Sequence, residues 1–287
     1  MLIVVCSLKG SPGVTTLTTA LGARWPDGET PILVEADPAG GDMMARFRLP
    51  DTPGLVSLAA AARGRAGSDP TLLAQHTQLL PGGLRVVLGP VGAEQARAAL
   101  SVLASGPASP LRRAADQPGT TIIADCGRVD PDSPAFPIIR NADAMLLLAR
   151  PSDDALAHVA LKLQAAQRWS RKPCFVLVGD GYPTDEVSQA LGIPVMGRVP
   201  HDPEGAAVLS GQSKGRRNPA KSALGRAAAR LALTAYNHWH ATNATTNNAT
   251  MNGVRPPQPG PAVLGERRAP SVTVQPLGLQ MRNGATP

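Results

Sequence analysis

Seven short apolar runs, four to six residues each, recur along the first 200 residues, with longer Ala- and Leu-rich segments between them. Buried parallel strands typically have such near-continuous apolar runs, and amphipathic segments between them are typical of the covering helices. The pattern therefore predicts repeated βαβ units and a doubly wound α/β fold, with a mostly parallel sheet of about seven strands flanked by helices. The runs are residues 2–6, 32–35, 84–88, 120–124, 144–149, 174–178 and 195–199.

The chain is expected to form one folded domain over residues 1–236. A helical segment at 220–236 carries the last apolar face, and the pattern stops after His238. The remaining residues are rich in Asn, Thr, Pro and Gly. Because this composition cannot bury enough apolar surface to form a core, we expect a disordered tail over residues 237–287.

The positive charge belongs to the C-terminal end of the chain. Residues 211–287 hold ten Lys and Arg and one acid, Glu266, whereas residues 1–210 hold 18 basic and 20 acidic residues. Any contact with a polyanion such as DNA is therefore expected in the basic segment 214–230. A solvated surface is the alternative role for this segment. Membrane contact is less favoured, because aromatic and bulky apolar residues are scarce.

The cysteines indicate a reducing compartment. Cys6, Cys126 and Cys174 are far apart, odd in number and close to apolar runs, as buried free thiols are. The N-terminal apolar stretch is short and lacks the basic leader of a signal peptide, and no run approaches the length of a membrane span. A cytoplasmic location is expected.

A phosphate-binding loop is predicted after the first apolar run. Residues 7–16 read SLKGSPGVTT and precede a helical stretch through Ala23. A glycine-containing loop between a strand and a helix exposes N–H groups and the positive end of the helix dipole, which bind phosphate. A structural strand-to-helix turn is the alternative. The candidate nucleotide-binding residues are Lys9, Gly10, Ser11, Pro12, Gly13, Val14, Thr15 and Thr16.

The loop departs from the usual pattern at one position. A P-loop carries a lysine directly before the Ser or Thr that binds Mg²⁺, and here Val14 precedes Thr15. The missing charge-assisted contact to phosphate is worth about 1.5–3 kcal/mol, or roughly tenfold to hundredfold in affinity. The sequence therefore favours weak or no turnover of nucleotide.

Two further apolar runs end in carboxylates. The first, ILVEADPAGGD, contains Glu35 and Asp37, and the second, TTIIADCG, contains Asp125. Because the carboxyl ends of parallel strands share one edge of the sheet, we expect Asp37 and Asp125 near the loop. Carboxylates there can hold Mg²⁺ through water, so the candidate metal residues are Thr15, Asp37 and Asp125. Helix caps or solvated turn residues are the alternative.

The loop resembles the deviant phosphate loop of the ParA/MinD group of ATPases, Lys-Gly-Gly-x-Gly-Lys-Thr-Thr. Lys9, Gly10, Gly13, Thr15 and Thr16 match it, and Ser11 and Val14 do not. Residues 80–90, LPGGLRVVLGP, look most like the CpaE/TadZ branch, which acts in pilus localisation.

The resemblance implies ATP and Mg²⁺ as ligands and a homodimer around the nucleotides. Lys9 would reach the partner subunit's phosphates, and Asp37 would orient the attacking water, so these two are the candidate catalytic residues. Residues 190–202 resemble the segment that precedes the family's adenine-contacting loop, which adds Pro200 and Asp202 as nucleotide-binding candidates.

Three functions remain open from the sequence. The first is a nucleotide-responsive positioning or partitioning ATPase, acting on a chromosome, a plasmid or a pilus or secretion machine, which dimerises on ATP and recruits an unidentified protein partner. The second is a catalytically degenerate scaffold that keeps the fold for dimerisation and partner binding. The third is a DNA-binding protein that acts through its basic C-terminal part.

Overall fold

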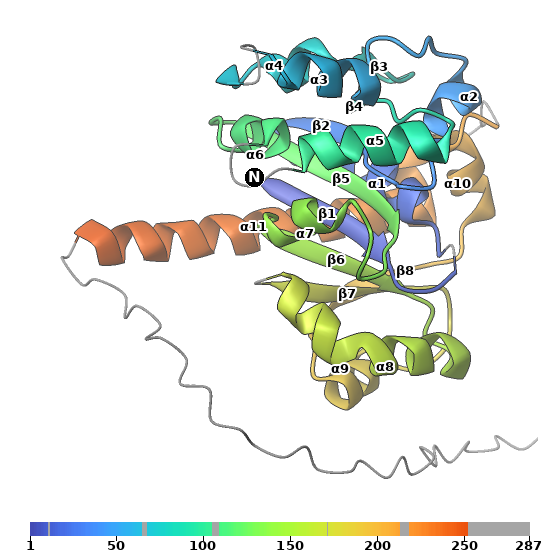
Figure 1. The fold of residues 1–287 in the computed structure, drawn as a ribbon. Helices are drawn as coiled ribbons and strands as arrows, with labels where there is room; N and C mark the ends of the chain where they lie inside the picture. Colours follow the sequence, from blue (N-terminus) through green and yellow to red (C-terminus); the bar gives the residue numbers. More distant parts are fainter. Residues whose placement is uncertain (11, 65–67, 105–108, 171, 213–217, 252–287) are drawn as a thin grey trace, which may run out of the picture. The chain divides into compact units, whose positions relative to one another are not determined.

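The computed structural model of the chain describes residues 1–10, 12–64, 68–104, 109–170, 172–212 and 218–251 (Figure 1). Its contacts divide the chain into two units, Met1–Ala244 and Thr245–Pro287. The sheet and every candidate site residue belong to the first unit, although Ser11 lies outside the described residues.

An eight-stranded sheet forms the centre of the first unit, in the order β3-β4-β2-β5-β1-β6-β7-β8. Neighbouring strands pair in parallel, except for the antiparallel pair β3 and β4 at one edge. The predicted mostly parallel α/β fold is confirmed. The strands are β1 (Leu2–Ser7), β2 (Thr30–Glu35), β3 (Gln78–Leu79), β4 (Arg85–Val87), β5 (Thr120–Arg128), β6 (Ala144–Ala149), β7 (Pro173–Val178) and β8 (Val195–Val199).

The additional strand is β3, which has only two residues. Such a short strand leaves no alternation in the sequence for a pattern to detect. A tight turn through Pro81, Gly82 and Gly83 joins it to β4, closed by the Leu80 N–H donating to the Leu84 carbonyl at 2.9 Å. This turn also lines a cavity described below.

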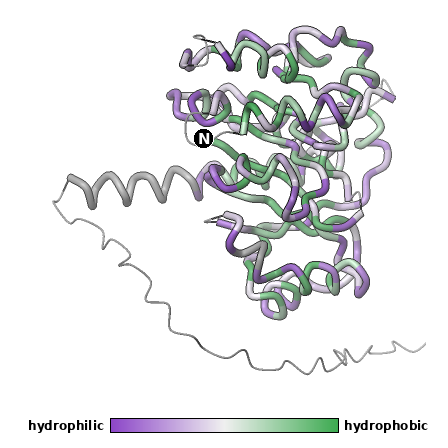
Figure 2. The backbone as a smooth tube through the Cα atoms, in the orientation of Figure 1, coloured by the Kyte–Doolittle hydropathy of each residue, from purple (hydrophilic) through white to green (hydrophobic). Residues whose placement is uncertain are grey.

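Helices cover both faces of the sheet (Figure 1). On β1, Leu2 and Val4 face one apolar cluster and Ile3 and Val5 face the other, as the two-residue period of a strand requires. Helices α3 to α9 contribute to the first cluster, and α1, α2, α10 and α11 contribute to the second. The most hydrophobic segments of the backbone therefore lie at the sheet, in the middle of the first unit (Figure 2).

The helices vary from one turn to eight, and a short 3₁₀ helix, η2 (Pro219–Lys221), precedes the last of them. They are α1 (Val14–Ala23), α2 (Met43–Phe47), α3 (Leu55–Ala62), α4 (Leu72–Gln75), α5 (Ala93–Leu103), α6 (Pro110–Ala115), α7 (Phe136–Arg140), α8 (Asp153–Trp169), α9 (Thr184–Leu191), α10 (Pro203–Leu209) and α11 (Ala223–Met251).

Helix α11 is longer than the sequence predicts. Leu224, Ala228 and Leu231 pack on the sheet, as expected for the segment 220–236, but the helix continues to Met251. No Gly or Pro occurs between residues 237 and 251, so nothing in the backbone chemistry stops the helix before Gly253. The predicted tail is thus helical over 237–251, and residues 252–287 lie outside the described residues.

The described cysteines are free thiols. Cys6 and Cys126 are buried, and Cys174 is half-buried. Burial raises the pKa of Cys6 to about 12, so this thiol stays protonated at neutral pH. Within the described ranges, no helix is both long and apolar enough to cross a membrane.

Candidate functional site

The predicted phosphate loop joins the C-terminal end of β1 to the N-terminus of α1. Gly10 and Gly13 have φ values of 69° and 92°, a left-handed conformation that glycine adopts without steric cost. Gly13 is the N-cap of α1, and no side chain caps this helix within the described residues. The N–H groups of the first turn therefore remain available to an anion.

Val14 lies in the core. Its side chain is 6% exposed and belongs to the same apolar cluster as Leu17 and Leu21 of α1. The position that a P-loop lysine would occupy is thus filled by an aliphatic group that packs on the sheet. Leu8 and Pro12 are buried as well, and Lys9 and Gly10 are exposed.

Thr15 and Asp125 lie side by side at the edge where the strands end. Asp125 aligns with Val5 of β1 and with Glu35 of β2, and its side chain is 1% exposed. The carboxylate accepts hydrogen bonds from the Thr15 hydroxyl and from the Gly127 N–H, the latter at 3.0 Å. The structure thereby brings together two of the three candidate metal residues.

Burial raises the pKa of Asp125 to about 7. The hydrogen bonds from Thr15 and Gly127 lower it, and the charges of Asp37 and Glu35 raise it further. At neutral pH this carboxyl group is therefore poised between its two protonation states. A cation in front of it would favour the charged state.

Asp37 lies directly over Gly127. A Cβ atom built on Gly127 would be 1.9 Å from Asp37 Oδ2, so only glycine allows the carboxylate to approach the backbone here. Asp37 Oδ1 accepts the Ala39 N–H at 2.7 Å. Burial raises the pKa of Asp37, and the nearby charges of Arg128 and Arg97 lower it. Asp37, Asp125 and Thr15 thus converge beside the loop.

Gly127→Ala is expected to destabilise the protein more than Gly10→Ala. Both residues have positive φ, which costs an alanine about 1–2 kcal/mol, but only Gly127 has a carboxylate where the new methyl would lie. We expect an excess loss of about 1 kcal/mol for the Gly127 variant, measured by urea unfolding. Equal losses in the two variants would mean that Asp37 does not lie against Gly127 in solution.

Glu35 supports the fold around the site. Its Oε1 accepts the N–H groups of Asp42 at 2.9 Å and Met43 at 3.0 Å, and its Oε2 accepts that of Gly89 at 3.0 Å. The side chain is 2% exposed, and burial raises its pKa despite these bonds. Glu35 therefore joins β2 to α2 and to the segment after β4. The Glu35 carboxylate thus accepts N–H groups at the start of α2, and the residue is buried, unlike a solvated turn residue.

A cavity of about 640 Å³ adjoins the phosphate loop. Pro200 and Asp202, predicted to contact a base, both line it. Asp202 also has a structural role, because its carboxylate accepts the N–H groups of Leu224 and Gly205, both at 2.9 Å, and these bonds lower its pKa. The volume of the cavity is within the range of small-molecule sites. Other lining residues include Gly13, Thr16, Leu17, Arg150, Asp180 and His201.

Arg150 is a cation of the site that sequence reasoning missed. It directly follows β6, the strand next to β1, and lines the same cavity as Gly13 and Thr16. Its side chain is exposed. The sequence resemblance extends through Arg150 without assigning it a role, because its place beside the loop depends on the pairing of β6 with β1.

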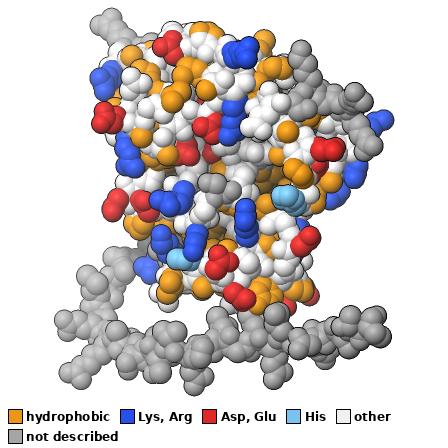
Figure 3. All heavy atoms as spheres, turned by 90° about the vertical axis from the view of Figure 1, so that its right-hand side faces the viewer, with side chains coloured by type: hydrophobic (Ala, Val, Ile, Leu, Met, Phe, Trp, Pro, Cys, Tyr) orange, Lys and Arg blue, Asp and Glu red, His pale blue; other side chains and the backbone are white. Residues whose placement is uncertain are grey.

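The exposed end of the site carries both signs of charge. Figure 3 looks onto the side of the molecule toward which β1 and β5 run in Figure 1, and basic and acidic side chains both occur there. Lys9 is exposed, and its charge contributes, after the Ser152 hydroxyl and the Ala155 N–H, to a lowered pKa of Asp154.

The oxygen atoms of Thr15, Asp37 and Asp125 suit a hard cation such as Mg²⁺, which keeps several waters and binds substrate phosphates. Within the described part of the chain, no three His, Cys, Asp or Glu side chains form a metal site by themselves. The residues therefore fit a Mg²⁺ ion shared with a phosphorylated ligand.

Comparisons with known proteins identify the fold. No protein-family model matches the sequence, and no curated protein matches it. Among solved structures, a ParA family ATPase from Chlorobium tepidum TLS is similar, with 20% identity and a TM-score of 0.62 over 81% of this chain and 97% of that one. The cell division ATPase MinD of Pyrococcus furiosus has 19% identity and a TM-score of 0.62 over 82% and 98%.

A third similar structure is the septum site-determining protein MinD of Pyrococcus horikoshii OT3 in complex with Mg-ADP, with 17% identity and a TM-score of 0.56 over 81% of this chain and 95% of that one. At these identities the likeness concerns the fold. The chain has the ParA/MinD-like α/β fold.

Proposed function

We propose that this chain is a cytoplasmic, nucleotide-responsive ATPase of the ParA/MinD type that positions or partitions a cellular cargo. The observation that carries the proposal is the meeting of a phosphate-type loop, the Thr15–Asp125 pair and the cavity beside Gly13 at one edge of the sheet. The Mg-ADP in the similar MinD of Pyrococcus horikoshii supports nucleotide and Mg²⁺ as the ligands.

Each part of the proposed site contacts a different part of the nucleotide. The N–H groups at the start of α1 bind phosphate oxygens, and the cavity lined by Pro200 holds the base. Thr15 and Asp125 supply oxygen atoms for Mg²⁺, which would neutralise charge on the phosphates. Arg150 supplies a cation in place of the lysine that Val14 replaces.

In hydrolysis, Asp37 orients a water for in-line attack on the γ-phosphorus. The new P–O bond forms as the bond to the β–γ bridging oxygen breaks, which gives ADP and inorganic phosphate. Lys9 is exposed at this edge, as a residue that contacts the nucleotide of a second subunit must be. Two subunits would enclose the nucleotides, and hydrolysis would separate them and release a protein partner.

The scaffold without turnover is the second candidate, and the buried Val14 favours it. In that case the fold serves dimerisation and partner binding, while Asp37 and Asp125 have no reaction to support. A turnover assay with Mg-ATP separates the two functions, provided that nucleotide binding has been measured first.

DNA binding remains a third element of the proposal. Lys221, Arg226 and Arg230 are exposed, whereas residues 214–217 of the basic segment lie outside the described residues. Removing the C-terminal part would delete α11, whose Leu224 and Ala228 are in the core. Charge reversal at Arg226 and Arg230 is therefore the suitable test, read as loss of salt-dependent DNA retention.

Isothermal titration calorimetry with ATP and ADP, with and without Mg²⁺, tests the proposed function. We expect Mg²⁺-dependent ATP binding with a dissociation constant on the order of micromolar. Arg150→Gln should weaken it about tenfold, because one charge-assisted contact is lost. Arg63→Gln, an exposed arginine at the end of α3, is the matched control and should bind as the unaltered chain does. Absence of ATP binding at millimolar nucleotide would reject the function.

A further inference from the structure

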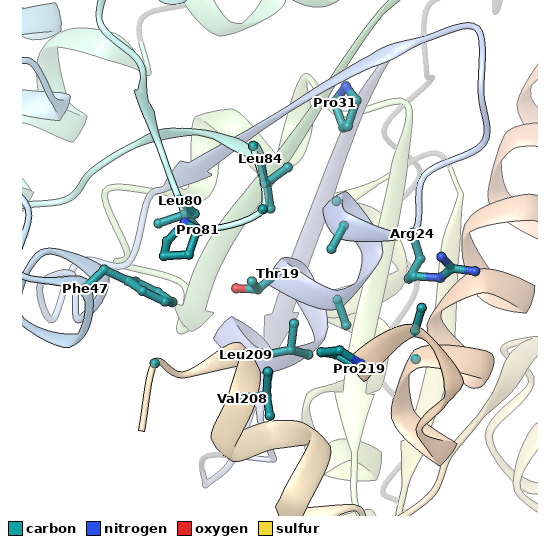
Figure 4. Close-up of a pocket in the computed structure, with 18 of the residues that line it drawn as sticks. Thr19, Arg24, Pro31, Phe47, Leu80, Pro81, Leu84, Val208, Leu209 and Pro219 are labelled. Carbon is teal, nitrogen blue, oxygen red and sulfur yellow. The ribbon is translucent and has the colours of Figure 1, made fainter. Parts of the chain in front are cut away.

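A second and larger cavity lies away from the phosphate loop. Its volume is about 1080 Å³, and none of the described residues lines both cavities. Its described walls are the second half of α1, the β3–β4 turn, the end of α2, the end of α10 and the start of η2 (Figure 4). The proposed function does not use this cavity.

The interior of the cavity is apolar. Phe47 of α2, Leu80 and Leu84 of the β3–β4 turn, and Leu209 of α10 come from three parts of the chain and surround Thr19 of α1 (Figure 4). Leu80 is buried, and the other three are half-buried. An apolar body of a ligand could therefore remove a substantial hydrophobic surface from water here.

Close backbone contacts fix the walls. A Cβ atom on Gly22 would lie 3.0 Å from Leu84 Cδ1, so α1 packs tightly against the β3–β4 turn. A Cβ atom on Gly211 would lie 3.1 Å from Phe47 Cδ1 and 2.9 Å from the Arg46 carbonyl oxygen. The walls are thus positioned by the packing of the fold, as expected for a largely preformed site.

Every charged residue among the described lining residues is an arginine. Arg24 comes from the end of α1, Arg46 and Arg48 from α2 and its C-cap, and Arg85 from β4. Arg46 pairs with the exposed Asp42 at 2.6 Å. Among the described residues, no ion pair involves Arg24, Arg48 or Arg85. The net charge of residues 1–210 is negative, so this cationic group is a local feature.

We propose that the arginine cavity, as we name this space, binds a small organic anion with an apolar body and one or more carboxylate, sulfonate or phosphate groups. The apolar interior takes the body, and the guanidinium groups take the anionic groups in charge-assisted hydrogen bonds. An acidic peptide from another protein would use the same charges but would not require an apolar interior. The volume favours the small ligand.

The test uses the full chain and the probe 8-anilinonaphthalene-1-sulfonate, with affinity measured by fluorescence titration. We expect saturable binding that weakens as salt rises. N-phenyl-1-naphthylamine, which lacks the sulfonate, should bind about tenfold more weakly. The double variant Arg24→Glu/Arg85→Glu should weaken binding of the sulfonate about tenfold to hundredfold, and the double variant Arg63→Glu/Arg140→Glu, away from the cavity, should leave it unchanged.

Three outcomes would overturn the proposal. The first is unchanged sulfonate binding in the Arg24→Glu/Arg85→Glu variant, with its melting temperature near that of the unaltered chain. The second is an equal loss in the Arg63→Glu/Arg140→Glu control. The third is displacement of the probe by a polyglutamate peptide at a concentration far below the dissociation constant of the probe itself. That result would assign the cavity to an acidic protein segment.

Discussion

Val14→Lys is expected to tighten Mg-ATP binding about tenfold to hundredfold, because it restores a cation to the turn from which the loop presents its N–H groups. The substitution also removes a valine that is 6% exposed. The lysine stem can retain part of the packing, while its ammonium must leave the apolar cluster. We therefore expect a loss of about 1–2 kcal/mol in the free energy of unfolding without ligand. Calorimetry and urea unfolding measure the two effects.

Val14→Met is the matched control, because it lengthens the side chain without adding charge. This variant should bind ATP as the unaltered chain does, so that any gain in the lysine variant is due to the charge. If Val14→Lys leaves ATP binding unchanged while the protein remains folded, the loop does not present its first turn to phosphate, and the structural-turn interpretation is correct. A gain in binding with no hydrolysis would support the scaffold function.

The sheet could be predicted from the sequence because buried parallel strands leave continuous apolar runs. The apolar pattern ends at Ala124, yet β5 continues to Arg128, because β1 and β2 flank it and supply hydrogen-bonding partners for Asp125. The proximity of Thr15 and Asp125 was also predictable, since Thr15 follows β1 and Asp125 follows the apolar run of the neighbouring β5, and these parallel strands run toward one edge. These inferences need only the local apolar pattern and the rule that the carboxyl ends of parallel strands share one edge of the sheet.

The remaining features depend on contacts between distant residues. Nothing in the sequence around Glu35 shows that its carboxylate accepts three backbone N–H groups, one of them from Gly89. The sequence shows that Val14 stands where a P-loop has lysine, but it does not show that Val14 packs in the core. The arginines of the arginine cavity are spread from Arg24 to Arg85, and the folding of α1, α2 and β4 brings them together.

Asp125→Asn is expected to stabilise the protein above pH 7 and to remove its Mg²⁺-dependent ATP binding. Burial raises the pKa of this carboxyl from its ordinary value of 3.8 to about 7. Between these values the folded chain keeps a proton that the unfolded chain has lost, so the free energy of unfolding falls as pH rises through this window and levels off above it. Asparagine carries no such penalty, and its amide oxygen can still accept the Gly127 N–H.

The expected gain above pH 7 is on the order of a few kcal/mol, or roughly 5–10 °C in melting temperature, and it should vanish near pH 4. Melting curves of both proteins from pH 4 to pH 8 measure it. In the unaltered chain, Mg-ATP binding should strengthen as pH rises through 7, because the charged carboxylate is the form that supports Mg²⁺. A more stable protein that has lost ligand binding would identify Asp125 as a residue retained for function at the expense of stability. A variant that is less stable at pH 8 would instead contradict the raised pKa of Asp125, and unchanged Mg²⁺-dependent ATP binding would contradict its assignment to the metal site.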